Sequence, residues 1–163
     1  MVYRFATGVG LPYGNSISMP FEKSFYAGGS NDIRAWQARE LGPGNLADSS
    51  KGAVDQIGNM SIIGSVEFRF DVTKVIEGAA FIDAGNIWNL NQDEGREETQ
   101  FAFNTLWQSL AIGPGIGIRF NFSFFIFRFD FATPIKDPGK PNPFEIKPQW
   151  DKTNLNFGIG YPF

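Results

Sequence analysis

Arginine and acidic residues are the side chains of this sequence with the clearest potential for chemistry. Arg34 follows two glycines, Gly28 and Gly29, in a polar stretch, while Glu67 and Asp83 occur in two later stretches of alternating polarity. A guanidinium binds carboxylates through paired hydrogen bonds, with a geometry that lysine does not match. Arg34 could therefore hold Glu67 and Asp83 in a buried site, or it could be a solvated loop arginine with two unrelated acids.

Catalysis by these acids is the weaker interpretation. Two carboxylates can perform glycoside hydrolysis, but no aromatic platform for a sugar is evident. The 163 residues include no Cys and no His, which removes the usual zinc sites, Ser-His-Asp triads, Cys nucleophiles and disulfides. The glycine-rich segment 113–117 lacks the Lys-Ser/Thr pair of a phosphate-binding loop. We therefore expect a protein that is not an enzyme and that has no metal site and no cofactor.

The composition indicates one domain that does not bind nucleic acid. The length suits a single domain, and 16% aromatic residues is too high a share for a disordered chain. The net charge is −3 and no run of Lys or Arg occurs, so the basic stripe of a nucleic-acid-binding protein is absent. No stretch reaches the roughly 18 consecutive apolar residues that a membrane helix needs.

Apolar and polar residues alternate with a period of two over most of the chain, which is typical of β-strands with one apolar face. We predict about seven strands and no helix: 3–11, 17–26, 62–71, 79–88, 111–121, 125–131 and 153–163. In the second of these, Pro20 has no backbone donor and must lie near the start of the strand. In the terminal strand 153–163 the apolar face consists of Leu155, Phe157, Ile159, Tyr161 and Phe163.

The connections between these strands alternate in length. Short connections at 11–16, 72–77 and 121–123 alternate with long ones at 27–59, 89–108 and 133–152. Short turns therefore lie at one end of an up-and-down antiparallel meander and long loops at the other, as in outer-membrane barrels. We predict an all-β, up-and-down antiparallel transmembrane β-barrel, with 1–163 as one barrel segment and 27–59 as a long loop that folds inward.

The alternation by itself leaves three architectures open. A soluble lipocalin-like barrel that binds lipids would place the large apolar side chains inside, whereas a membrane barrel places them toward lipid. A passive outer-membrane pore shares the second arrangement. Strands of about ten residues span a bilayer when tilted, and aromatic residues at strand ends suit its interfaces. These two features favour a membrane barrel.

Several segments resemble the C-terminal barrel of the BamA/TamA superfamily, of the bacterial surface antigen type, over nearly the whole chain. The most specific match is Phe25–Trp36, in which paired glycines precede a hydrophobic-Arg-Gly-aromatic tip, although Ala35 replaces the usual glycine. The remaining matches are Leu41–Gly44, Val66–Phe70, Ala80–Trp88, Gly115–Arg119 and the terminal Phe163. The tip Ile33–Trp36 and the ending Ile159–Phe163 look closer to the TamA-like branch.

The resemblance implies that this chain supplies about the last seven strands of a sixteen-stranded barrel in the bacterial outer membrane. The remaining N-terminal strands and the periplasmic domains of the family would then lie on a longer protein, which would also explain why residues 1–5 do not resemble a secretory signal. The family places its loop arginine against acids at the positions of Glu67 and Asp83. Partners would be the lipid bilayer and unfolded outer-membrane protein clients, and the function would be their assembly or translocation.

The terminal strand carries the mechanism that the resemblance suggests. Gly158, Gly160 and Pro162 weaken a strand, so a client strand could add at the barrel seam by β-augmentation. Tyr161 and Phe163 resemble the terminal signal by which outer-membrane proteins are recognised for assembly. The alternative is that all five residues only mark the seam of a barrel.

Overall fold

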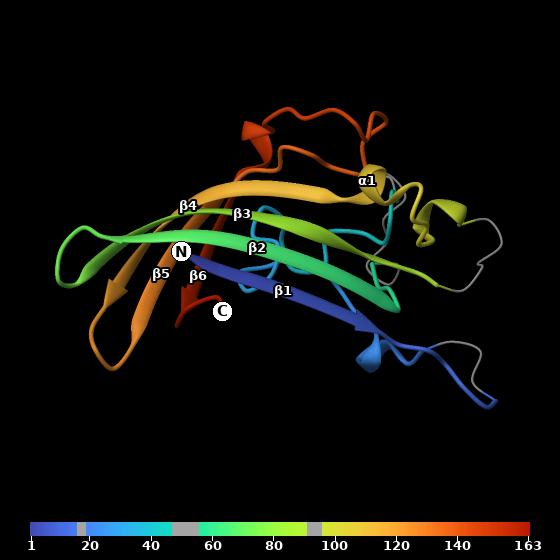
Figure 1. Ribbon diagram of the computed structural model, residues 1–163, viewed down its shortest axis with the longest axis horizontal. Coiled ribbons are helices and arrows are strands. Elements are labelled where there is room, and N and C mark those ends of the chain that lie inside the picture. The colour runs from blue at the N-terminus through green and yellow to red at the C-terminus, as the bar shows by residue number, and fades with distance from the viewer. Residues whose placement is uncertain (16–18, 47–55, 91–95) are drawn as a thin grey trace.

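The computed structural model describes residues 1–15, 19–46, 56–90 and 96–163. Within these ranges one antiparallel sheet holds six strands, each beside its sequence neighbour (Figure 1). The strands are β1 (Val2–Val9), β2 (Met60–Asp71), β3 (Ile76–Trp88), β4 (Ala111–Asn121), β5 (Ile126–Ala132) and β6 (Asn154–Ile159). The helical elements are α1 (Leu106–Ser109) and the 3-10 turns Phe21–Lys23, Glu97–Thr99 and Trp150–Lys152. None of the helices in the described ranges is long and apolar enough to cross a membrane.

The strand register places charged residues of four strands on one face. Glu67 of β2 is opposite Phe81 of β3, and Arg119 of β4 is opposite Glu77 of β3 and Arg128 of β5. Because side chains alternate between the two faces of a sheet, opposed residues share a face. The prediction of an all-β, up-and-down antiparallel order is therefore confirmed.

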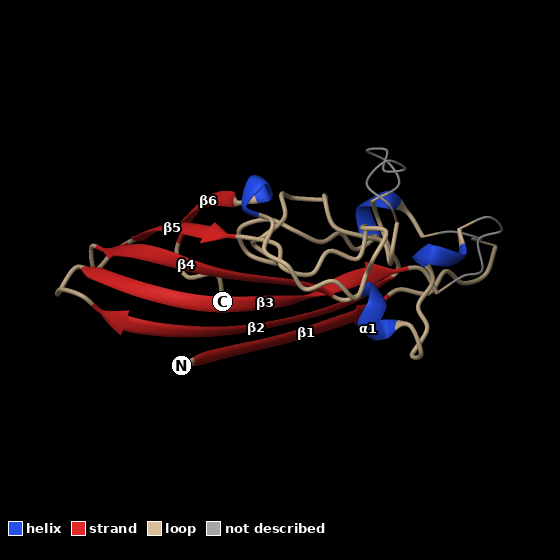
Figure 2. Cartoon of the chain, turned by 90° about the horizontal axis from the view of Figure 1, so that it is seen from above, coloured by secondary structure: helices blue, strands red, loops and turns tan. Residues whose placement is uncertain are grey.

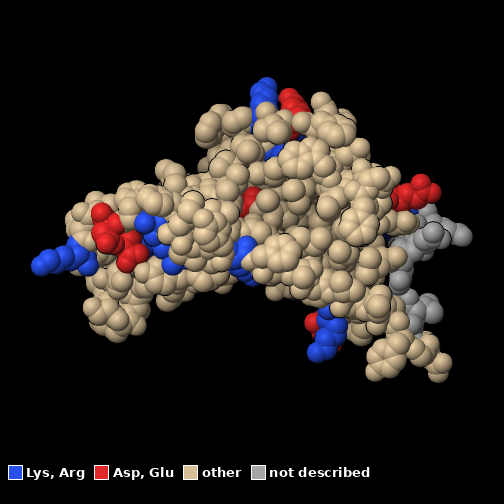
Figure 3. All heavy atoms as spheres, viewed as in Figure 1, with Lys and Arg blue, Asp and Glu red and all other residues tan. Residues whose placement is uncertain are grey.

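The two faces of the sheet differ in polarity. The inner face, part of which segment 27–46 covers, carries the ionisable residues of the strands, and five of them are completely buried: Glu67, Asp83, Arg119, Arg128 and Asp130. The outer face exposes large apolar side chains, including Phe5 (75% exposed), Ile116 (65%) and Ile159 (68%). In Figure 3 charged side chains gather mainly at the margins of the molecule and are few over the strands. A soluble lipocalin-like barrel has the reverse arrangement, so this distribution argues against that alternative.

The hydrophobic core lies between segment 27–46 and the inner face. Figure 2 shows the long loops gathered at one end of the strands and along one side of the sheet. The buried apolar residues come from the loop and from the strands together: Ala27, Ile33, Ala35, Trp36, Leu41, Ile63, Phe81, Ile87, Ala111 and Ala132. Residues 27–46 of the long loop thus pack on the inner face, while residues 47–55 lie outside the described part.

Residues 19–26, the described part of the strand expected at 17–26, do not join the sheet, which has six strands and not seven over the described ranges. Residues 16–18 lie outside the described part, and Phe21–Lys23 is a 3-10 turn that follows Pro20. Beyond it only Phe25 pairs in strand fashion, through an isolated bridge to Gly58. The proline lacks a ladder donor, and the 3-10 turn that follows it is incompatible with extended strand backbone. Residues 10–59 therefore connect β1 to β2, with 16–18 and 47–55 outside the described part. One helical turn, α1, was also not expected.

The terminal strand is shorter than predicted. It ends at Ile159, and Gly160 has a φ of +84°, a conformation that few other residues adopt. The amide of Gly160 donates to the carbonyl of Ile126 at 2.8 Å, after which the chain leaves the sheet. Pro162 therefore removes no ladder donor, contrary to expectation, and Tyr161 and Phe163 do not continue the outer apolar face.

Candidate functional site

Segment 27–46 forms a compact loop whose tip is Ile33–Trp36. A bridge between Ala27 and Leu41 closes its base, and the amide of Gly29 donates to the carbonyl of Trp36 at 2.9 Å. Gly28 and Gly29 have φ values of +97° and +107°, and a Cβ at Gly28 would overlap a backbone carbonyl of the same loop. The two glycines are thus needed for the turn that directs the tip at the sheet.

Arg34, at this tip, is bound by the two acids that the sequence singled out. Its Nε and Nη2 donate to the two carboxylate oxygens of Asp83 at 2.8 and 2.9 Å, and its Nη1 donates to Oε2 of Glu67 at 2.7 Å. The guanidinium also lies 3.3 Å from the ring centroid of Phe81. All three charged side chains are buried. We refer to Arg34, Glu67 and Asp83 together as the arginine lock.

Further charged residues extend the arginine lock along β2, β4 and β5. Oε1 of Glu67 accepts from Nε of Arg69 at 2.6 Å and from Nη2 of Arg119 at 2.9 Å. Asp130 lies 3.2 Å from Arg119, 3.3 Å from Arg128 and 3.7 Å from Arg34. A buried charge is strongly unfavourable without partners, so this network makes the position of Arg34 depend on four strands.

The terminal strand also holds the loop tip, which sequence reasoning missed. The side-chain amides of Asn154 and Asn156 donate to the backbone carbonyl of Arg34 at 3.1 and 2.8 Å. Asn154 and Asn156 lie on the inner face of β6, so their polar type and their alternation were the available signals. Sequence reasoning did not place Arg119, Arg128 or Asp130 in this site, because no local pattern shows that a loop arginine lies among them.

The opposite side of the tip packs against a strand glycine. A Cβ at Gly113 of β4 would overlap the Cβ of Ala35 and lie 3.4 Å from the Trp36 ring. Gly113 therefore provides the room for Ala35, the residue that replaces the glycine usual in the resembled family.

A reciprocal substitution tests this contact. Gly113→Ala should lower the free energy of unfolding by about 1–3 kcal/mol, because it overpacks a buried site. Ala35→Gly combined with Gly113→Ala should recover most of that loss, since only one methyl group then occupies the space. Urea unfolding of the full-length protein, followed by gel mobility of unheated samples, measures both. A double variant as unstable as Gly113→Ala alone would contradict the packing argument.

Asp32, beside the lock, predicts a pH dependence of stability. Burial raises the pKa of this loop carboxyl from 3.8 to about 6, although Arg4 and a backbone hydrogen bond from Gly28 oppose the shift and Asp83 adds to it. The folded state then binds a proton that the unfolded state releases, so stability should fall as the pH rises from about 4 to about 6.

Asp32→Asn should remove this fall, which is at most about 3 kcal/mol at 1.36 kcal/mol per pKa unit. Thermal unfolding in the same detergent measures this. The wild type should unfold at a lower temperature at pH 7 than at pH 4.5, and the variant should lack this difference. Equal pH dependence in both proteins would assign the effect to other groups.

Comparisons with known proteins relate the whole chain to one superfamily. The model of the Omp85 superfamily domain matches residues 1–163. The chain is 28% identical over 174 residues to the outer membrane protein assembly factor BamA of Neisseria meningitidis serogroup B, covering 96% of this chain and 21% of that protein. The crystal structure of BamA from Haemophilus ducreyi lacking POTRA domains 1-3 has a similar fold, with a TM-score of 0.59 and 17% identity, over 96% of this chain and 30% of that one.

This chain thus spans about a fifth of the length of the first of these proteins and less than a third of the second. The family match, in contrast, extends over every residue of the chain. It agrees with the resemblance of segments 25–36 and 66–70 at the level of the superfamily. The chain belongs to the Omp85 superfamily.

Proposed function

We propose that this chain is the C-terminal part of a sixteen-stranded barrel in the bacterial outer membrane, which assembles or translocates outer-membrane proteins. Membership of the Omp85 superfamily and similarity to an outer membrane protein assembly factor support this. The exposed apolar outer face suits a lipid bilayer. The remaining strands and periplasmic domains would belong to the rest of the protein, and its clients would be unfolded outer-membrane proteins. We further propose that it lies closer to the TamA-like branch, on the sequence of its loop tip and ending.

The observation that carries this proposal is the weak edge at β6. This strand has 6 residues, against 12 in β2 and 13 in β3, and it pairs only with β5 in the described sheet. The tail after Gly160 turns toward the inner face, where it contacts Arg69 and Glu77, so it does not extend this short strand. An unpaired edge is a template for β-augmentation, and lipid makes an unsatisfied edge costly. A client strand that pairs with β6 would satisfy it.

The arginine lock serves a structural role in this proposal, and the protein is not an enzyme. Glu67 and Asp83 are completely buried and each is bound by Arg34. Neither carboxylate is therefore open to a substrate as a general acid or base. A passive pore is the competing function, and the packing of segment 27–46 on the inner face disfavours it, because the loop occupies space that a conducting channel would need.

Site-specific crosslinking tests strand addition at β6. Leu155 of β6 and Phe131 of β5 are opposite each other and both point to the outer face, at 58% and 45% exposure. The chain has no native cysteine, so Leu155→Cys and Phe131→Cys variants of the full-length protein each carry one reactive thiol from this region. During assembly, a client with a cysteine in its own terminal strand should form a disulfide with Leu155→Cys at least about tenfold more often than with Phe131→Cys, because the bond needs Cα atoms within about 7 Å.

Equal crosslinking at the two positions would contradict pairing at the β6 edge. Efficient assembly of the client in reconstituted vesicles without a crosslink at Leu155→Cys would also contradict pairing at this edge. High ion conductance without any acceleration of client folding would instead support the passive pore.

A further inference from the structure

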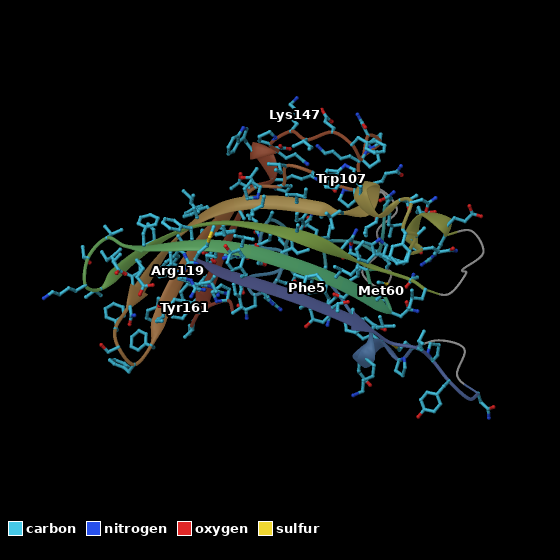
Figure 4. The ribbon with its side chains drawn as sticks, in the orientation of Figure 1. Phe5, Met60, Trp107, Arg119, Lys147 and Tyr161 are labelled. Atoms are coloured by element: carbon cyan, nitrogen blue, oxygen red, sulfur yellow. The ribbon has the colours of Figure 1, made fainter. Side chains whose placement is uncertain are left out.

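The C-terminal tripeptide Tyr161–Phe163 lies against the inner face of the sheet. The Tyr161 hydroxyl donates to the carboxylate of Glu77, with its oxygens at 3.0 and 3.1 Å. Glu77 is opposite Arg119 in the sheet and shares the inner face with it. Figure 4 labels Tyr161 and Arg119 in the same region, toward the end of the sheet that carries the short turns.

Arg69 contacts both ends of this tripeptide. Its guanidinium lies 4.2 Å from the ring centroid of Tyr161 and 5.8 Å from that of Phe163. Its Nη2 donates to the backbone oxygen of Phe163 at 3.3 Å. These contacts join a cation–π interaction to a hydrogen bond, so Arg69 of β2 holds the tail in its inward position.

The same guanidinium is bound to the arginine lock. Nε of Arg69 donates to Oε1 of Glu67, whose Oε2 is occupied by Arg34. An arginine prefers to bind a carboxylate with two parallel hydrogen bonds, from two nitrogens to two oxygens. Arg69 makes only one such bond here, because Arg34 holds the second oxygen, and its other nitrogen is left for Phe163.

We propose that Arg69 is a positioning residue that couples the inward C-terminal tripeptide to the insertion of Arg34. When Arg34 leaves Glu67, Oε2 of that carboxylate becomes available to Arg69, and Nη2 of Arg69 moves from Phe163 to Oε2, while Oε1 stays shared between Arg69 and Arg119. When the tripeptide leaves, Nη2 is free to compete with Arg34 for Oε2. Loop insertion and tail position thus favour each other, and by linkage the two effects are equal in size.

This inference deepens the proposed function and rests on it. The coupling would connect the loop to the strand edge where a client adds. Asn154 and Asn156 already tie the start of β6 to the carbonyl of Arg34. With Arg69 at the other end, the terminal strand and its tail are both linked to the same loop residue. Withdrawal of the loop would release the whole terminal segment.

Thiol labelling of the full-length protein in detergent tests the coupling without any client, so its failure is distinguishable from failure of the proposed function. Pro162 is buried, and Pro162→Cys should react slowly with a water-soluble maleimide. Arg34→Ala and Arg69→Gln should each raise that rate by about tenfold, within the range usual for coupled sites. The combination of both should raise it no further than the larger single effect. Arg39→Gln, an arginine of the same loop outside the lock, should leave the rate unchanged.

The reciprocal measurement uses the loop tip and needs no change at Arg34. Ile33 is completely buried, and Tyr161→Ala should raise the labelling rate of Ile33→Cys by a similar factor. Arg34→Lys provides a milder lock variant if Arg34→Ala does not fold, and it should give an intermediate rate at Pro162→Cys. An unchanged rate at Pro162→Cys in both Arg34 variants overturns the proposal. The proposal is also overturned if the Arg34→Ala, Arg69→Gln combination raises the labelling rate of Pro162→Cys by the product of the two single effects.

Discussion

Arg34→Ala should destabilise the protein by about 3–5 kcal/mol and abolish the proposed assembly function, a larger loss than at any other position between Asn31 and Leu46. The substitution leaves the buried Glu67 without its cation at Oε2 and the buried Asp83 without its cation at both oxygens. Removal of one partner from a buried ion pair has a cost of this order, because the remaining charge stays desolvated. Urea unfolding measures the stability, and folding of a client in reconstituted vesicles measures the function.

Three further variants separate the lock from a general effect of loop substitution. Arg34→Lys should restore part of the stability, because an ammonium keeps the charge but cannot reproduce the paired hydrogen bonds to Asp83. Arg39→Ala should be close to neutral, since Arg39 contacts only aromatic rings outside the lock in the described structure. The double variant Glu67→Gln with Asp83→Asn should reduce the effect of Arg34→Ala. If that double variant is silent and leaves the Arg34→Ala phenotype unchanged, the lock has no functional role.

Much of the sheet follows from local sequence pattern. Strands such as β2 and β4 alternate regularly, and a period of two fixes which residues share a face before any partner is known. That is why the inward phase of Glu67, on β2, could be predicted. Arg34 is a different case: a loop longer than thirty residues has no periodicity that sets its path. Only the resemblance of its glycines and tip to a known family directed it to those acids.

The errors arise where single residues override the alternation. Tyr161 and Phe163 continue the apolar pattern of β6, yet the left-handed backbone of Gly160 takes them out of the strand. Their partners, Arg69 and Glu77, are more than eighty residues away in sequence. No local pattern can reveal such contacts, because they depend on which strands lie opposite the tail in the folded sheet. The same holds for Asn154, whose partner is the backbone of the loop tip.

Ile116→Arg should cost about 2–4 kcal/mol of folding free energy in a bilayer, because a charge near the midplane faces lipid. Ile116 lies in the middle of β4, on the outer face, and is 65% exposed in the isolated chain. In water, a substitution at so exposed a position usually changes stability by less than about 0.5 kcal/mol. The environment of the outer face therefore decides the result. If this face contacts lipid, Ile116→Arg should lose much folding free energy, and if it contacts water, almost none.

Phe124→Arg is the matched control for this prediction. Phe124 is 84% exposed, but it lies in the short turn between β4 and β5, where a membrane barrel meets the interface. Arginine there should cost only about 0–1 kcal/mol in the same vesicles, because the penalty for charge falls with distance from the midplane. Urea titrations of the full-length protein in lipid vesicles, with folded and unfolded forms separated on a gel, give both values. Equal and small losses at Ile116 and Phe124 would mean that the outer face does not contact the hydrocarbon layer, and the membrane orientation of the sheet would then be wrong.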